Sequence, residues 1–131
     1  MIPKYRAWYV LAEEMINEIL MISFVRKEII GKFSNGSTSV PLKFEDERNG
    51  EDVILMQSTG LKDKNGKEIF EGDIVKMSKD VYSEPTYYEV VRHRSGAYRL
   101  ESKQHGCELW LRHTNCEVVG NVYETKELLD A

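Results

Sequence analysis

The sequence predicts a mainly β fold, an all-β barrel or roll, on three observations. Six or more short segments have the aromatic and β-branched composition of strands, with turn residues between them. Asn65-Gly66 and Ser95-Gly96 each separate two such segments, as in β-hairpins. The 131 residues contain no internal repeat and no low-complexity tract, and they suffice for one domain with an extension.

The first element is an edge strand over residues 3–10, because Pro3 opens it and cannot donate a backbone hydrogen bond. Residues 11–30 fit two interpretations. Several apolar side chains recur at helical spacing and three glutamates lie on the other face, which slightly favours a helix. The residues at helical spacing are Met15, Ile16, Ile19, Leu20 and Phe24, and the glutamates are Glu13, Glu14 and Glu18. If the segment is a strand, one face carries Ile16, Leu20, Ile22 and Phe24, and Glu18 is misplaced.

The central part alternates turns with strands. Residues 31–39 form a turn-rich connection, residues 43–52 a charged loop with little apolar character, and residues 53–57 a short strand. Asn65-Gly66 predicts a type I′ hairpin turn within residues 62–67. Gly72, between Glu71 and Asp73, redirects the chain into a strand over 74–77.

The last part predicts four strands and a helix. The strands cover residues 87–94, 97–101, 108–112 and 117–123, and Ser95-Gly96 joins the first two. A short helix covers residues 124–129. The predicted organisation is an N-terminal extension over residues 1–52, as hairpin or short helix, followed by a barrel over residues 53–131, together in one compact unit.

The composition argues against a disordered acidic tail, a collagen-like repeat, a disulfide scaffold and a membrane protein. Hydrophobic residues make up 41% and charged residues 31%, as in ordinary soluble proteins. The net charge of −4 argues against a general nucleic-acid binder. Residues 33–75 carry nine acidic and five basic side chains, whereas residues 91–113 carry five basic and two acidic ones. One local basic patch is therefore compatible with the acidic total.

Cysteine content and hydropathy predict a cytoplasmic protein. Cys107 and Cys116 are too few for a disulfide scaffold. The N-terminal residues lack the basic-then-apolar order of a signal peptide, and the longest apolar stretch is too short to cross a membrane. We expect reduced thiols and no membrane association.

Three stretches resemble the YopX family of phage and prophage proteins. The central one covers residues 56–75 and reads MQSTGLKDKNGKEIFEGDIV. Residues 2–8 (IPKYRAW) are similar to the opening of the family, and residues 118–124 (VVGNVYE) to its closing strand. The chain departs from the family at residues 9–12, where members usually place a more polar turn.

The resemblance implies an SH3-like β-barrel part, a phage or prophage origin, a location in the cytoplasm of the host bacterium and self-association. It also implies a β-hairpin that turns near Glu13-Glu14, against the local helical pattern. The family has no established biochemical activity, so it supplies no catalytic residues. The glycines and apolar residues of the central stretch fit turns and core, which specify a fold rather than a reaction.

Four carboxylates of the central stretch, Asp63, Glu68, Glu71 and Asp73, are candidates for an acid/base or metal site. Because they fall in predicted turns, we interpret them as solvent-exposed structural residues, with Asp63 and Asp73 accepting hydrogen bonds from turn amides.

Two pairs of potential zinc ligands flank residues 108–112: His105 with Cys107, and His113 with Cys116. Their spacing matches no standard zinc finger, and an ordinary strand with buried cysteines explains it as well. They are weak metal candidates, and we predict no cofactor.

Aromatic and basic residues alternate in a third group, formed by Tyr87, Tyr88, Arg92, Arg94, Tyr98 and Arg99. Single-strand binders combine cations with rings that stack on bases. On a strand, Arg92 and Arg94 share a face with Tyr88 and Val90, and such a face runs from core into solvent or into an interface. Tyr88, Arg92, Arg94, Tyr98 and Arg99 are the nucleic-acid-binding candidates.

No nucleophile elbow, phosphate-binding loop or dinucleotide motif is present. We therefore predict a non-enzymatic phage accessory protein that acts through contacts with itself and with an unidentified phage or host protein. The alternative is a small nucleic-acid-binding or regulatory module that uses residues 87–113. A metal-dependent enzyme at the Cys/His group is a third, weaker hypothesis.

Overall fold

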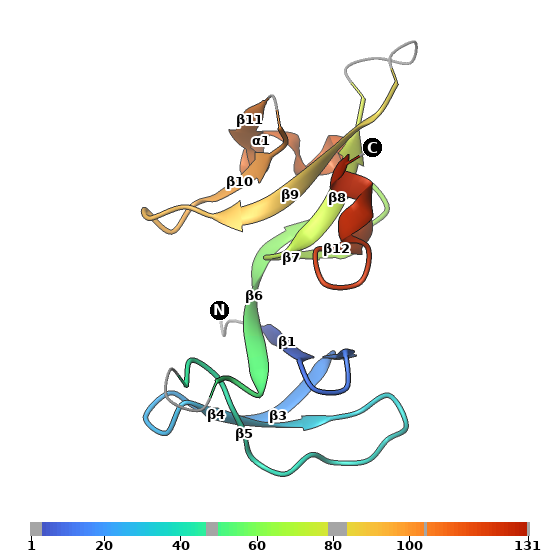
Figure 1. The fold of residues 1–131 in the computed structure, drawn as a ribbon. Coiled ribbons are helices and arrows are strands. Elements are labelled where there is room, and N and C mark those ends of the chain that lie inside the picture. The colour runs from blue at the N-terminus through green and yellow to red at the C-terminus, as the bar shows by residue number, and fades with distance from the viewer. Residues whose placement is uncertain (1–3, 47–49, 79–83, 104, 131) are drawn as a thin grey trace. The chain divides into compact units, whose positions relative to one another are not determined.

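The structure, a computed structural model, describes residues 4–46, 50–78, 84–103 and 105–130. It is mainly β, as predicted, and the chain divides into two compact units, residues 1–57 and 58–131 (Figure 1). The division falls inside one strand, a few residues beyond the boundary at 52/53 that the sequence suggested. Pro3, the tip of the 43–52 loop and the start of the IPKYRAW stretch lie outside the described residues.

The described residues of unit 1 form five strands and the first half of a sixth: β1 (Tyr5–Tyr9), β2 (Glu14–Ile16), β3 (Glu18–Ser23), β4 (Glu28–Lys32), β5 (Leu42–Lys43) and β6 (Val53–Lys62). All pairings are antiparallel. β1 pairs with β2 on one side and with β6 on the other, and β3, β4 and β5 form a second sheet in that order. The prediction of an edge strand at residues 3–10 is therefore wrong, because β2 folds back onto the free side of β1.

Residues 11–30 form strands, and the helix favoured by the local pattern is wrong. The chain turns after β1, Glu13 has a positive φ of 51°, and Ala7 then faces Ile16 in β2. The hairpin near Glu13-Glu14 that the family resemblance implied is thus confirmed. Pairing with β1 and β4 gives these strands backbone hydrogen bonds, and Ile16 and Ile29 are buried completely. A local helical pattern contains no information on these distant partners.

The core of unit 1 consists of buried residues from β1, β2, β4, β5 and β6 and from the loop after β5: Ala7, Ile16, Ile29, Leu42, Phe44 and Val53. Two half-buried residues of β3, Ile19 and Ile22, pack against it. Phe44 is 3% exposed and contacts the ring of Phe24 at 6.1 Å between centroids. The 43–52 loop therefore contributes a core residue, Phe44, which its high charge did not indicate.

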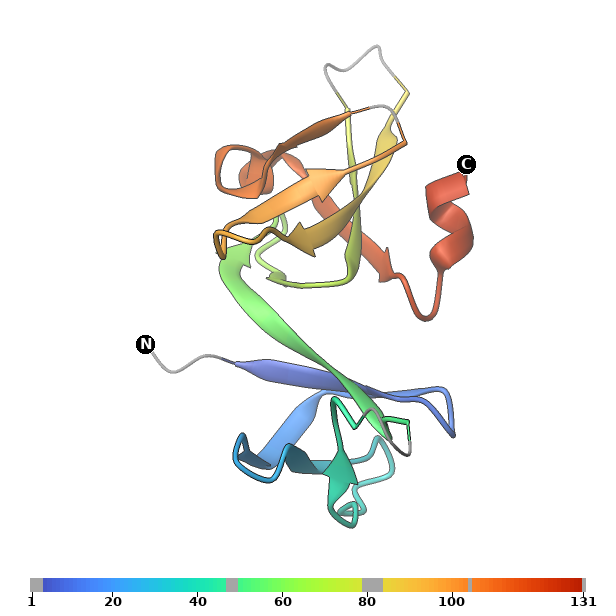
Figure 2. The same ribbon diagram turned by 60° about the vertical axis from the view of Figure 1, so that its left-hand side comes forward.

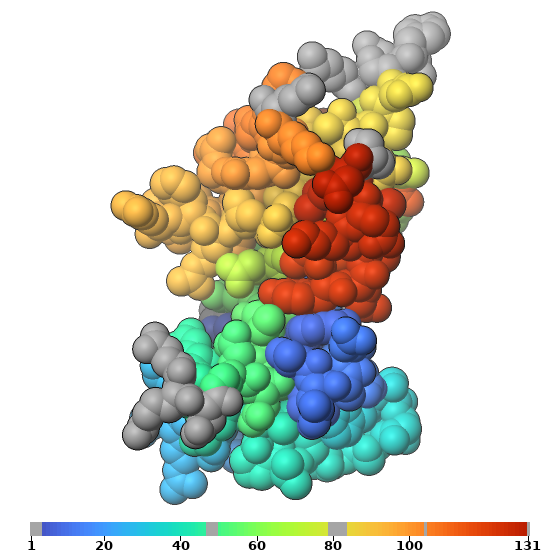
Figure 3. All heavy atoms as spheres, in the orientation of Figure 1, coloured from blue at the N-terminus to red at the C-terminus, as the bar shows by residue number. Residues whose placement is uncertain are grey.

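The described residues of unit 2 form the end of β6 and nine further elements: β7 (Glu68–Phe70), β8 (Asp73–Met77), β9 (Thr86–Arg92), β10 (Tyr98–Glu101), β11 (Gly106–Glu108), the one-turn helix α1 (Leu109–Arg112), the 3₁₀ helix η1 (His113–Asn115), β12 (Glu117–Asn121) and the 3₁₀ helix η2 (Lys126–Asp130). Five of the strands make an antiparallel sheet in the order β11-β10-β9-β8-β12, which curls in Figure 2. The short terminal helix of the sequence prediction corresponds to η2, which contacts β8 and β9 (red in Figure 3).

The core of unit 2 includes Ile69, Val75, Tyr88, Val90, Leu100, Leu109 and Cys116. The predicted strand over residues 108–112 is wrong, because the chain makes a helical turn after Glu108. That turn buries Leu109 and leaves Trp110 and Leu111 exposed, whereas a strand would place Leu109 and Leu111 on the same face.

Three turns share one geometry, at residues 33–37, 63–67 and 93–97. In each, the amide of the first residue donates to the carbonyl of the fifth, and the amide of the glycine at the fourth position donates to the carbonyl of the first, at 2.7–3.0 Å. Gly66 has a φ of 81°, while Asn65 is not among the described non-glycine residues with positive φ. The hairpin prediction at Asn65-Gly66 is confirmed, but its turn is type I with a glycine bulge rather than type I′.

Candidate functional site

The predicted basic-aromatic face is divided between core and surface. Tyr88 is buried in the core of unit 2, so its ring is not available for stacking. Arg92 ends β9 at the surface and lies opposite Tyr98 in the ladder, and Arg94 is exposed in the following turn. As expected, this strand face runs from core into solvent.

Arg99 is held by acidic neighbours. Its guanidinium lies 2.5 Å from Glu108 Oε1, and its Nε lies 3.5 Å from Glu101. Two carboxylates thus offset the charge of this candidate. The exposed basic side chains that remain in the predicted set are Arg92 and Arg94.

The four metal candidates differ in burial and in their partners. His105 is exposed, Cys107 is half-buried, and Cys116 is buried, where its thiol donates to the His113 carbonyl at 3.3 Å. His113 Nδ1 lies 2.8 Å from the Lys62 carbonyl, which can only accept, so Nδ1 carries a proton. Within the described part of the chain, no group of three or more His, Cys, Asp or Glu side chains is placed to hold a metal ion. Burial raises the pKa of the Cys116 thiol to about 11.

The central carboxylates mainly bind backbone amides. Asp63 accepts hydrogen bonds from the amides of Asn65, Lys67 and Val118, each at 2.9 Å. Asp73 accepts one from Phe70 at 2.8 Å, and Glu68 accepts one from the Ser58 hydroxyl at 2.5 Å. The predicted bonds of Asp63 and Asp73 to turn amides are confirmed. Their predicted exposure is wrong, since both are buried. The turn that carries Asp63 folds back on β12, and Asp73 lies opposite Asn121 of β12 in the ladder.

Burial by itself would raise the pKa of Asp63. The amides of Val118, Lys67 and Asn65, and the nearby charge of Lys67, outweigh burial and lower the pKa below its ordinary value of 3.8. Asp63 is therefore ionised near neutral pH and is suited to joining segments rather than to accepting protons in catalysis.

Exposed apolar side chains gather at β3 and the turn that follows it. We call Leu20, Met21, Phe24 and Val25 the β3 patch. Their exposed fractions are 50%, 48%, 58% and 96%. A bulge inserts an extra residue between Ile19 and Met21, so the two neighbours Leu20 and Met21 are both exposed. The sequence indicated an apolar surplus in this region without showing which side chains reach the surface.

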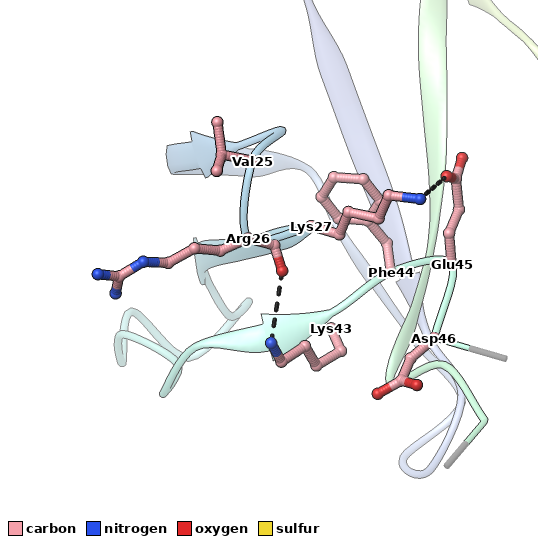
Figure 4. A pocket seen from close by; sticks show the side chains of 7 residues that line it. All are labelled: Val25, Arg26, Lys27, Lys43, Phe44, Glu45 and Asp46. Carbon is pink, nitrogen blue, oxygen red and sulfur yellow. Dashed lines mark hydrogen bonds and ion pairs between the residues drawn. The ribbon is translucent and has the colours of Figure 1, made fainter. Parts of the chain in front are cut away.

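A groove of about 660 Å³ lies next to this patch, between the β3–β4 turn and the segment after β5. Figure 4 shows its lining, which is Val25, Arg26, Lys27, Lys43, Phe44, Glu45 and Asp46. Lys27 pairs with Glu45 at 3.5 Å, and Lys43 with Glu28 at 3.6 Å. The groove arises from the β4–β5 pairing, for which we found no signal in the sequence.

The comparison with known protein families assigns the chain. The model of the YopX protein family matches residues 4–130. The chain belongs to the YopX family. The crystal structure of protein EF1440 from Enterococcus faecalis is similar to this YopX-family chain, with a TM-score of 0.65 and 31% identity over 98% of this chain and 99% of that one.

Protein yopX from Bacillus subtilis has the same fold, with a TM-score of 0.63 and 24% identity over 95% of each chain. No curated protein matches the chain. None of the helices in the described part of the chain has the length and apolarity needed to cross a membrane.

Proposed function

We propose that this YopX-family chain is a non-enzymatic phage or prophage accessory protein that acts through protein contacts as a homo-oligomer. Its place of action is the cytoplasm of the host bacterium, where it also meets an unidentified phage or host protein. An SH3-like barrel in the second half of the chain, supported by the curled antiparallel sheet, belongs to the same proposal.

The observation that carries this proposal is the β3 patch. Exposed apolar side chains are ordinary when scattered singly, but here four fall within residues 20–25, and such a concentration points to an interaction surface. Three residues of unit 2 that were candidates for an acid/base or metal site also support a role in protein contacts rather than catalysis. Asp63 and Asp73 are engaged with backbone amides, and the thiol of Cys116 is buried.

Co-expression of two differently tagged copies tests the proposal. We expect one copy to co-purify the other after nuclease treatment, because protein contacts alone hold them together. Recovery of a single tag, or co-purification that disappears with nuclease, would contradict self-association through protein contacts.

The nucleic-acid module stays a second candidate, on the observation that Arg92 and Arg94 are exposed beside one another at the β9–β10 turn. Each phosphate contact makes binding weaker in salt. This candidate predicts salt-sensitive binding of a fluorescent single-stranded oligonucleotide that Arg92→Ala with Arg94→Ala removes, and no binding at micromolar protein would exclude it.

A further inference from the structure

The outer edge of β3 has features of a strand that pairs with another chain. β3 lies at the edge of the sheet β3-β4-β5, so within that sheet only one of its sides is paired. The unpaired N–H and C=O groups of an edge strand are a template for a further strand. Proteins usually protect such an edge with charged residues or proline. Between Glu18 and Arg26 the sequence has neither.

The side chains along this edge favour an apolar contact. Ile19 and Ile22 pack on the core of unit 1, while Leu20 and Met21 are about half exposed. Phe24 and Val25 continue the exposed apolar surface into the turn. Phe24 is also fixed by edge-on contacts with Tyr5 and Phe44, at 5.9 and 6.1 Å between ring centroids. A partner would therefore meet a largely preformed surface, which reduces the entropic cost of binding.

The charges at the two ends of the patch are self-complementary. Glu18 is exposed at the start of β3, and Arg26 is exposed just beyond its end. β3 ends at Ser23, and Arg26 lies in the turn that follows it. If two copies place their β3 strands antiparallel, the turn that carries Arg26 in each copy lies toward the start of β3, with Glu18, in the other. A parallel arrangement would bring like charges together instead, which is destabilising. The edge thus favours one occupant in one orientation.

We propose that the partner at the β3 patch is a second copy of this chain, with the two β3 strands antiparallel. This inference rests on the proposed self-association and locates it. Two short strands and their side chains bury less than the roughly 1,600 Å² of a standard interface. We therefore expect a reversible dimer whose population changes over micromolar concentrations.

Charge reversal tests both the site and the orientation. The variants Glu18→Arg and Arg26→Glu each place like charges together twice in their own dimer, so each alone should dimerise at least about tenfold more weakly. In an equimolar mixture of the two, both contacts are again between opposite charges. We expect the mixture to recover dimers, measured by sedimentation velocity with one variant labelled.

The mixture separates interface effects from folding effects. Within one chain, Glu18 faces Lys32 of β4 and Arg26 lies 3.9 Å from Glu28, so either reversal can weaken the fold. Mixing cannot repair a fold, and circular dichroism checks it in each variant. Recovery on mixing supports the proposal, whereas dimerisation equal to the wild type in both single variants overturns it.

A matched pair of apolar substitutions gives an independent test. Leu20 and Leu111 are exposed to similar extents, on β3 and on α1. We expect Leu20→Lys to weaken dimerisation about a hundredfold and Leu111→Lys to leave it unchanged. A wild-type chain that is monomeric throughout would overturn both this inference and the proposed function. An oligomer that persists in Leu20→Lys would overturn only the assignment to β3.

Discussion

At the residue scale, Asp63 is a side chain that joins two segments 55 residues apart in the sequence. Its Oδ1 accepts from the amides of Asn65 and Lys67 in its own turn, and its Oδ2 accepts from the amide of Val118 in β12. Because the carboxylate is buried, no water can easily replace these bonds once it is removed. Its role is to fix the turn of the YopX-family central stretch against the last strand.

We expect Asp63→Ala to lower the free energy of unfolding by about 2 kcal/mol or more, because it leaves buried amides without an acceptor. Urea denaturation measures the change. Asp130→Ala is the control and should change little, because its ion pair with Lys103 lies on the exposed surface. An Asp63→Ala variant as stable as the wild type would contradict the role assigned to Asp63.

The same carboxylate predicts a pH dependence. Its folded-state pKa lies below the ordinary value of 3.8, so the stabilisation is present above that pH. It is lost as the pH falls from 3.8 through the folded-state pKa. The stability difference between the wild type and Asp63→Ala should therefore shrink over this range. A stability difference that stays constant as the pH falls would contradict the role assigned to the ionised carboxylate of Asp63.

The two thiols differ in burial, and this predicts their reactivity. Burial raises the pKa of both, that of Cys116 to about 11, and the thiolate is the reactive form. In the folded protein at neutral pH, iodoacetamide should label Cys107 slowly and Cys116 more slowly still, with both fast in denaturant. Mass spectrometry of a time course measures this order, and equal rates in the folded state would contradict it.

The residue types predict which hydrogen bonds the side chains form, but not which side chains are buried. Asp63 and Asp73 were expected to accept from turn amides, and they do, since this is a local preference of aspartate. Their burial depends on β12 and on packing between strands far apart in the sequence. For the same reason Tyr88 could not be assigned to the core in advance, although the face it shares with Arg92 was expected to run from core to solvent.

At the element scale, turns were predictable where glycine marks them. Gly66, Gly72 and Gly96 all have positive φ, at 81°, 87° and 88°. Element type was less predictable where the spacing of apolar residues fits both a helix and a strand. Residues 11–30 contain strands because they pair with β1 and β4. Residues 109–112 form a helical turn, in which one side chain of the four, that of Leu109, is buried.

Gly31 in β4 tests how tightly these strands pack. A Cβ at this position would lie 2.5 Å from Cγ2 of Ile16, a fully buried side chain. We expect Gly31→Ala to cost about 1–3 kcal/mol, because the crowded methyl belongs to a rigid β-branched residue. Thermal denaturation measures it.

Gly106 in β11 is the matched control. A Cβ there would meet the far end of the flexible Arg99 side chain at 3.0 Å, so Gly106→Ala should cost clearly less. If the two substitutions had equal effects, the close contact between β4 and β2 would be in doubt.

At the scale of the whole molecule, the chain forms two units, each with its own buried core. The sequence indicated a mainly β chain, the family and a surplus of apolar residues near the N-terminus. The division within β6 follows from its two sets of partners, β1 along its first half and β7 along its second. Such pairing is not encoded in local composition.

Self-association of the complete chain is the central claim, and light scattering during gel filtration tests it most directly. The monomer mass is 15.2 kDa. We expect the mass to rise above this value as the protein concentration increases through the micromolar range. A mass that stays at 15.2 kDa at every concentration would contradict the claim.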